Sequence, residues 1–213
     1  ADGGSRGKGK GRVARVAGEA DGSSRGKGRV SGVDLLPEGR LSAELSVSVT
    51  TDPEPRLLAA WDHLVASTPG SDVTQLSAWA GIRRLVGYEP LYVLVHAEQW
   101  VLGGATLLRR RVRGIGWLGY LPYGPLLREG MGSARAVVRD VLADALVRVA
   151  REQAALFVQP PERGDDLALE LLLRGFRFSS AGIAPSATLR VDLTRSEEEL
   201  RAGLSRRLRT WTR

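Results

Sequence analysis

A long amphipathic helix set between short apolar strands is the feature that most restricts the fold of this chain. Apolar residues recur at helical spacing from Met131 to Gln153, and the arginine and aspartate residues lie mostly on the opposite face. The apolar stripe consists of Ala134, Val137, Val138, Val141, Leu142, Ala145, Leu146 and Val149. Burying such a stripe contributes roughly 1.5–3 kcal/mol for each large side chain. The helix is therefore expected to pack on a sheet.

Short apolar runs bounded by turn residues predict strands on both sides of this helix. The predicted strands are Leu91–Ala97, Trp100–Val112, Ile115–Tyr123, Ala155–Val158, one that begins with Phe176 and Phe178, and Ala187–Leu193. The other predicted helices are one opened by Asp52-Pro53-Glu54 and running to about Val65, one from Ser71–Thr74 to Leu85, Asp165–Arg174, and Ser196–Leu208 after a Thr194-x-x-Glu197 capping box. Helices interleaved with a mainly antiparallel mixed sheet indicate an α/β fold, of the α+β kind, in one domain of about 170 residues.

The composition changes along the chain and predicts three segments. Residues 1–40 are rich in Gly, Ser, Arg and Lys, and they cannot bury enough apolar surface to offset the entropy of ordering. They are predicted to be a disordered basic extension, which holds all three lysines and most of the net charge of +7. Residues 41–195 are predicted to form the folded domain, and residues 196–213 to begin a helical, Arg-rich segment.

The residue types that the chain lacks exclude several chemistries. It has no cysteine, so disulfides and thiolate metal sites cannot form. Its two histidines, His63 and His96, are far apart in the sequence, so neither a metal site nor a Ser-His-Asp hydrolase is expected. No apolar run reaches the roughly 20 residues that span a bilayer, and no secretory signal is visible. A cytoplasmic protein is therefore expected.

The run from Tyr120 to Pro125 ends a predicted strand with two tyrosines, two prolines and a glycine. Proline fixes φ, and glycine permits backbone conformations that a Cβ would forbid, so a stiff turn is expected. Hydroxyl groups on a stiff turn lose little entropy on binding, which favours a ligand-binding role for Tyr120 and Tyr123. The alternative is an ordinary strand exit whose tyrosine edges cap the core.

A second pattern, Arg111-Val-Arg-Gly-Ile-Gly116, matches R-x-x-G-x-G. In acyl-CoA-dependent acyltransferases of the GNAT fold, such a run binds a pyrophosphate with backbone N–H groups in front of a helix. Here an apolar strand follows the run, so the helix N-terminus that favours anion binding is missing. We interpret it as a hairpin turn.

Six short motifs follow one another between about residue 50 and residue 213. They are Asp72-x-x-Gln75-x-x-x-Trp79, Gly103-Gly104-Ala105-x-x-Leu-x-Arg, Tyr120-Leu-Pro-Tyr-Gly-Pro125, Val158-x-Pro160-Pro161, Gly175-Phe176-Arg177, and Thr188-x-x-Val191-Asp192-Leu193 followed by Glu-Glu-Glu-Leu. In this order they resemble the FemX/FemAB family of aminoacyl-tRNA-dependent peptidoglycan bridge aminoacyltransferases.

The resemblance implies a GNAT-like domain that uses neither acetyl-CoA nor another cofactor. Members of this family move an amino acid from aminoacyl-tRNA, the donor, onto an amine of the peptidoglycan-precursor stem peptide. The acceptor muropeptide is lipid-linked or nucleotide-linked, and a lipid-linked acceptor would bring the protein close to the membrane. The expected role is cell-wall synthesis and, through it, cell shape.

The resemblance also implies which residues bind the acceptor. Arg83 stands eight residues after Gln75, where the family often has a lysine that contacts an acceptor phosphate, and arginine keeps that charge. Tyr120 and Tyr123 would line the acceptor cleft, and Arg209 and Arg213 align with an arginine-rich run that faces the acceptor. The alternatives are a solvated helix-face cation for Arg83 and a charged terminus for the last two arginines. No catalytic residue is assigned, because an activated ester attacked by an amine needs mainly orientation.

The family usually has a second GNAT-like domain, so residues 1–213 are expected to be the first domain and inactive alone.

Two other functions remain open on sequence grounds. One alternative is an acyl-CoA-dependent GNAT N-acyltransferase that uses Arg111–Gly116. The other is an RNA-binding module that works through the basic residues 1–32.

Overall fold

The computed structural model describes residues 13–15, 30–34, 42–162, 164–181, 183, 191–192 and 194–211. The chain divides into two compact units, Arg12–Ala184 and a second one that combines Ala1–Gly11 with Pro185–Arg213. The first unit contains the sheet and its helices, and the second contains two short helices. The predicted domain of residues 41–195 therefore differs from the first unit at both ends.

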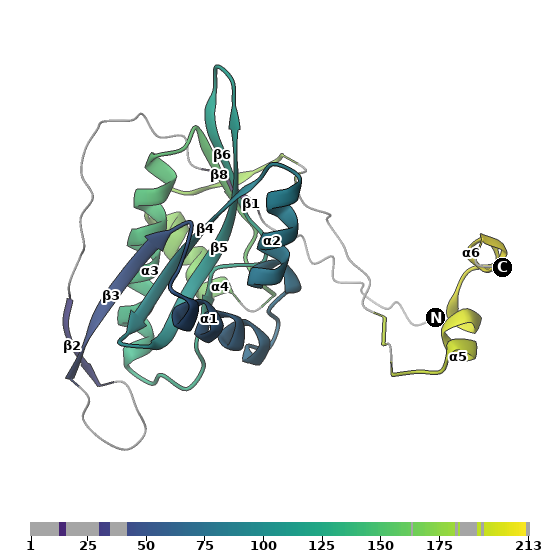
Figure 1. Ribbon diagram of the computed structural model, residues 1–213, viewed down its shortest axis with the longest axis horizontal. Helices are drawn as coiled ribbons and strands as arrows, with labels where there is room; N and C mark the ends of the chain where they lie inside the picture. The colour runs from purple at the N-terminus through teal and green to yellow at the C-terminus, as the bar shows by residue number, and fades with distance from the viewer. Residues whose placement is uncertain are drawn as a thin grey trace, which may run out of the picture. The chain divides into compact units, whose positions relative to one another are not determined.

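The first unit is built on one sheet, which has nine strands in the described part of the chain (Figure 1). Eight strands follow the order β2-β3-β4-β5-β6-β8-β1-β9. Strand β7 is not on this path and pairs with β5. Their bounds are β1 Val13–Arg15, β2 Val30–Asp34, β3 Ser42–Thr50, β4 Glu89–Ala97, β5 Trp100–Val112, β6 Gly116–Leu121, β7 Leu126–Leu127, β8 Ala155–Val158 and β9 Arg177–Ser179. Neighbours are antiparallel except β6 and β8, which are parallel. The predicted mainly antiparallel mixed sheet is confirmed.

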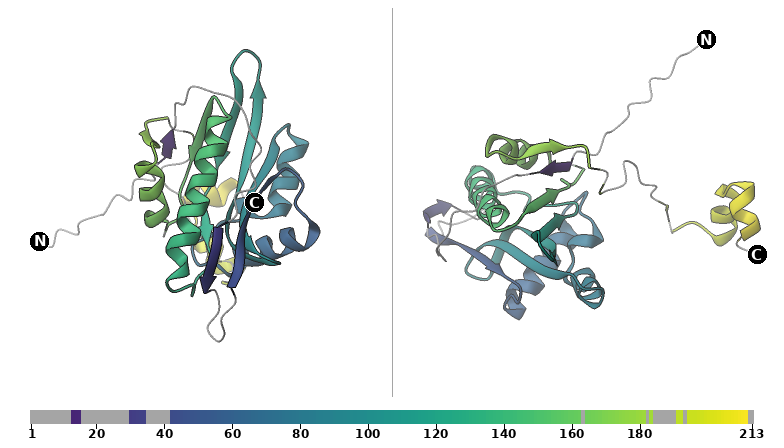
Figure 2. Two further views of the ribbon diagram at one scale, coloured as in Figure 1. Left: turned by 90° about the vertical axis from the view of Figure 1, so that its left-hand side faces the viewer. Right: turned by 90° about the horizontal axis from the view of Figure 1, so that it is seen from above.

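Helices cover both faces of this sheet, as the left view of Figure 2 shows. Helices α1 (Pro55–Ser67) and α2 (Ser77–Leu85) lie on one face, and α3 (Ala134–Arg151) and α4 (Asp165–Leu173) lie on the other. Strand β4 is buried on both sides: Val93 packs with the α3–α4 layer and Leu94 with the α1–α2 layer. This double burial explains its continuous apolar run.

Helix α3 confirms the amphipathic pattern in the sequence. Its stripe residues Val138, Leu142 and Leu146 are fully buried in the larger core cluster. The helix begins at Ala134, three residues later than predicted, and Gly130 and Gly132 in the preceding loop have φ of 75° and 51°. A residue with positive φ does not fit into an α-helix, so α3 can begin only after the second of these glycines.

The second helix begins later than predicted because the segment before it forms a separate turn. Val73–Gln75 is a short 3₁₀ helix (η1), and the Asp72 carboxylate accepts a hydrogen bond of 2.9 Å from the Thr74 N–H. Leu76 is extended, with φ −71° and ψ 148°, and α2 begins at Ser77. The turn directs the Gln75 side chain into the core.

Strand β3, Ser42–Thr50, is a further difference, because the sequence analysis places the start of the fold near Leu41 without a strand there. Strands β1 and β2 lie inside residues 1–40, the segment predicted to be disordered, and most of that segment lies outside the described residues. Strand β2 pairs with β3, with Val30 opposite Leu45 and Val33 opposite Ala43. Valine favours strands, and β3 offers β2 a pairing partner. Composition alone cannot reveal such a partner.

The second unit contains α5 (Glu197–Gly203) and α6 (Arg206–Trp211) where one helix, Ser196–Leu208, is predicted. The chain is extended at Leu204, with φ −72° and ψ 147°, next to Gly203. The capping box also differs: Ser196 caps α5 and Glu199 returns the bond, so Thr194 and Glu197 do not form it. Of the predicted strand Ala187–Leu193, residues 191–192 are not in a strand and the others lie outside the described residues.

Candidate functional site

The R-x-x-G-x-G run forms the turn of the β5–β6 hairpin, and the turn interpretation is confirmed. Val112 pairs with Gly116, and the Ile115 N–H donates to the Val112 carbonyl over 3.1 Å. Strand β6 begins at Gly116, so no helix follows the run. The linked ends of β5 and β6 project beyond the neighbouring strands (Figure 1).

Gln75 joins three parts of the first unit through its fully buried side chain. Its Nε2 group donates to the carbonyls of Thr106, over 3.2 Å, and Pro122, and its Oε1 accepts from the Thr106 N–H over 2.9 Å. The Trp61 indole N–H bonds both the Gln75 carbonyl and Thr106 Oγ1, each over 2.9 Å. A buried network with every partner satisfied is rigid, so α1, η1 and β5 hold the turn after β6 in place.

Tyr120 and Tyr123 lie close together at this turn. The Tyr120 hydroxyl donates to Oε1 of Gln159, which follows β8. Burial, with smaller contributions from Tyr123 and Asp72, raises the pKa of Tyr120 to about 12, so the side chain is neutral at physiological pH. Tyr123 has φ 47°, a left-handed conformation that costs a non-glycine residue about 1–3 kcal/mol and that clusters at functional sites.

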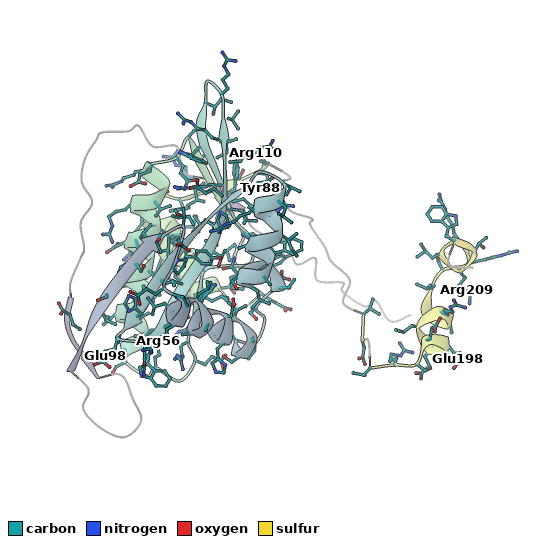
Figure 3. The ribbon with its side chains drawn as sticks, in the orientation of Figure 1. Arg56, Tyr88, Glu98, Arg110, Glu198 and Arg209 are labelled. Atoms are coloured by element: carbon teal, nitrogen blue, oxygen red, sulfur yellow. The ribbon has the colours of Figure 1, made fainter. Side chains whose placement is uncertain are left out.

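Arg83 lies over the ring of Tyr88, with its guanidinium carbon 4.3 Å from the ring centroid. Arg110 from β5 is 6.0 Å from the same centroid, and Figure 3 shows Tyr88 and Arg110 near the base of the projecting hairpin. Arg83 Nε is buried and has no hydrogen-bond partner among the described residues. Arg83 is therefore a positioned cation with one donor that no described protein group satisfies.

Arg83 and Tyr120 lie over the same face of the sheet. Thr106 faces α1 and η1 through its bonds to Trp61 and Gln75. Alternate residues of a strand share a face, so Leu108 and Arg110 face the same way, and Tyr120 does too because it pairs directly with Leu108. Among the described residues no hydrogen bond or ring contact links Arg83 with either tyrosine, so the structure establishes only that Arg83 and Tyr120 share a face.

An open hollow of about 770 Å³ lies at the base of the projecting hairpin on this unit. It is lined by Thr51, Asp52, Arg84, Gly87, Tyr88, Glu89, Arg110, Arg111 and Trp117. Its volume falls in the range of roughly 300–1,000 Å³ that small-molecule sites occupy. Three arginines against two carboxylates give the lining a positive balance.

The two remaining predicted site residues, Arg209 and Arg213, belong to the second unit. Arg209 is exposed in α6, in the second unit, and Arg213 lies outside the described residues. Among the described residues no group of His, Cys, Asp and Glu side chains could hold a metal ion, and His96 instead contacts the Glu98 carbonyl over 2.9 Å. Nor does that part of the chain contain a helix long and apolar enough to cross a bilayer.

Four residues of this region carry roles that the sequence analysis did not assign: Gln75, Tyr88, Arg110 and Gln159. Gln75 and Gln159 fall inside quoted motifs, so their positions were visible although their hydrogen bonds were not. Tyr88 and Arg110 are 22 positions apart, and only the pairing of β4 with β5 brings them together. No local pattern could have linked them.

Comparison with known proteins gives a likeness at the level of the fold. A solved structure of FemX superposes with a TM-score of 0.50 at 22% sequence identity, over 72% of this chain and 40% of the FemX chain. A ribosomal-protein-alanine N-acetyltransferase from Brucella melitensis biovar Abortus 2308 gives 0.43 and 13%, over 69% of this chain and 99% of its own. A tandem GNAT protein from the clavulanic acid biosynthesis pathway gives 0.43 and 8%, over 80% and 51%.

This chain thus spans less than half the length of the FemX chain that it matches. No protein-family model and no curated protein sequence matches it. The sheet order, the helices on both faces and the structural likenesses together establish a GNAT-like α/β fold.

Proposed function

We propose that this protein is an aminoacyltransferase of peptidoglycan synthesis that acts on a phosphate-bearing muropeptide acceptor. The observation that carries the proposal is the Gln75 network, which holds the Tyr120–Pro125 turn on the same sheet face as Arg83. A fixed pair of tyrosines can orient a peptide. An arginine held in place over the Tyr88 ring can bind a phosphate through its terminal N–H groups.

The proposed reaction needs little from the protein beyond orientation. The acceptor amine attacks the ester carbonyl of the aminoacyl-tRNA, an amide bond forms, and the ribose hydroxyl leaves with the proton that the amine loses. The Tyr120 hydroxyl is fixed by Gln159 and stays neutral at physiological pH. It can therefore orient the substrates by hydrogen bonding without ionising. The proposal includes aminoacyl-tRNA as the donor substrate, the muropeptide as the acceptor substrate, and a cytoplasmic location.

The second candidate is an acyl-CoA-dependent N-acyltransferase, and one observation favours it. Gly130 and Gly132 have positive φ directly in front of α3, which is the setting in which a helix N-terminus binds phosphate. The first free donors of that helix are, however, engaged: the Ala134 N–H bonds Met131 O over 3.1 Å and the Arg135 N–H bonds Gly132 O over 3.3 Å.

The backbone between β6 and β8 also disfavours this candidate. The two strands pair in parallel as far as Leu121 and Val158. Beyond them the Gln159 N–H donates to Leu121 O over 2.9 Å and the Gly124 N–H to Gln159 O over 3.0 Å. Backbone hydrogen bonds therefore join β6 and β8 up to the ends of both strands. Between them no strand edge is left free to pair with an extended acyl-CoA.

Calorimetric titration with two ligands separates the candidates. A nucleotide-linked muropeptide is expected to bind residues 1–213, and acetyl-CoA is expected to give no saturable heat. Binding is the sharper test because the resemblance implies that these residues alone do not turn over. Saturable binding of acetyl-CoA with none of the muropeptide would overturn the proposal in favour of the second candidate.

A further inference from the structure

We propose that the hairpin surface, which comprises Arg109–Trp117 of the β5–β6 hairpin together with Tyr88 and Arg84 beside its base, binds a single-stranded nucleic-acid segment. If the proposed function holds, the natural occupant is the single-stranded end of the donor RNA, and that identity alone rests on the proposed function. The binding chemistry rests on the contacts of the hairpin surface itself.

The first argument is charge. Arg110, Arg111 and Arg113 are exposed, and among the described residues none of them has a carboxylate within ion-pair distance. Arg109 is paired with Glu89, which removes one acidic group of the hollow from competition. Guanidinium groups bind phosphate oxygens in a bidentate manner, so this surface can follow a chain of phosphates.

The second argument is the placement of aromatic rings among these arginines. The Arg109 guanidinium carbon lies 4.7 Å from the Trp117 ring centroid, and Tyr88 contacts both Arg83 and Arg110. Trp117 and Tyr88 line the same hollow as Arg110 and Arg111. Alternating rings and guanidinium planes stack on bases without regard to sequence, which is how proteins bind single strands.

The residue types of the surface distinguish this occupant from an anionic membrane. The open hollow of about 770 Å³ is lined mainly by charged, polar and aromatic side chains. The turn itself carries one exposed apolar side chain, Ile115, and membrane-binding segments need several.

The test is fluorescence anisotropy of the full chain with a labelled single-stranded oligoribonucleotide, titrated over a range of salt concentrations. The double variant Arg111→Gln/Arg113→Gln is expected to bind at least about tenfold more weakly. Its plot of log affinity against log salt is expected to be shallower by about 1.4, because each phosphate contact on a single strand contributes about 0.7. The control Arg56→Gln/Arg177→Gln removes the same charge from α1 and β9 and is expected to match the unmodified chain.

Ultraviolet cross-linking of the oligonucleotide followed by peptide mass spectrometry gives a readout that needs no variant. Cross-links at Tyr88 or Trp117 support the proposal, and cross-links confined to other peptides overturn it. Equal loss in both double variants, or equal binding of anionic vesicles or polyglutamate, also overturns it. Failure of muropeptide binding would remove the proposed function and leave these oligonucleotide results unaffected.

Discussion

The carboxamide of Gln75 lies 3.1 Å from the point that a Cβ atom on Gly124 would occupy. Leu121 Cδ1 lies 3.0 Å from the same point. Gln75 cannot withdraw, because its side chain is bonded to the backbone of Thr106 and Pro122. The close approach of Gln75 therefore disfavours a larger residue at position 124, in the turn that carries both tyrosines.

Replacing Gly124 with alanine is expected to lower the free energy of unfolding by about 1–3 kcal/mol, because the added methyl group overpacks the buried network. The matched control is Gly81→Ala in α2, where nothing lies within 4 Å of the new Cβ. There alanine is expected to raise stability by about 0.5–1 kcal/mol. Urea unfolding of both variants measures the difference, and similar effects at the two sites would contradict the contact.

Replacing Gln75 with leucine is expected to cost at least about 3 kcal/mol. The Thr106 N–H and the carbonyls of Thr106 and Pro122 lose their buried partner, and each unsatisfied buried group costs about 1–3 kcal/mol. Gln159→Leu is the comparison, because among the described residues its side chain has one hydrogen-bond partner, the Tyr120 hydroxyl. It is expected to cost about 1 kcal/mol in the same unfolding experiment. A Gln75 variant no less stable than the Gln159 variant would show that the network contributes little.

Most of this fold could be predicted from periodic patterns, because β4, β5, β6, α3 and β8 each bury a regular set of apolar side chains. Strand β3, which pairs with β4, was not predicted because its serines and valines alternate and do not form a continuous apolar run. The late start of α2 depends on the inward turn of Gln75, which is a tertiary contact.

The candidate site was predictable only in part. The stiff Tyr120–Pro125 turn follows from its prolines and glycine, and the structure keeps Tyr120 and Tyr123 together. Tyr88 joins Arg83 and Arg110 through strand pairing, which leaves no signature in a single sequence. Placement of Arg209 in the second unit could not be predicted either, because helix periodicity says nothing of domain partition.

Tyr120 is expected to ionise with a pKa of about 12 in the folded protein, because burial disfavours its phenolate. An unfolded tyrosine ionises near pH 10, so the folded state holds the proton more tightly between about pH 10 and pH 12. The contribution to stability is complete below pH 10 and is lost as the pH rises through the folded pKa. The difference in phenolate absorbance between the unmodified chain and Tyr120→Phe is expected to rise near pH 12. A midpoint near 10 in this difference would show that Tyr120 is solvated.

Arg83 provides the sharpest test of acceptor binding. Arg83→Gln keeps a side chain of comparable reach but removes the charge, so its affinity for a nucleotide-linked muropeptide is expected to fall about 10- to 150-fold, the equivalent of one charge-assisted hydrogen bond of about 1.5–3 kcal/mol. Arg83→Lys keeps the charge and is expected to lose less, because a point charge still attracts phosphate although it cannot bind two oxygens at once.

Arg56→Gln on α1 is the control for overall charge, and it is expected to leave calorimetric affinity unchanged. Circular dichroism checks that the loss of the Arg83–Tyr88 stack has not unfolded the domain. If Arg83→Gln and Arg56→Gln bind the muropeptide equally well, Arg83 is only a cation stacked on Tyr88, and the acceptor phosphate must be bound elsewhere. If Arg83→Gln alone loses affinity and Arg83→Lys recovers part of it, the positive charge of Arg83 is what attracts the acceptor phosphate.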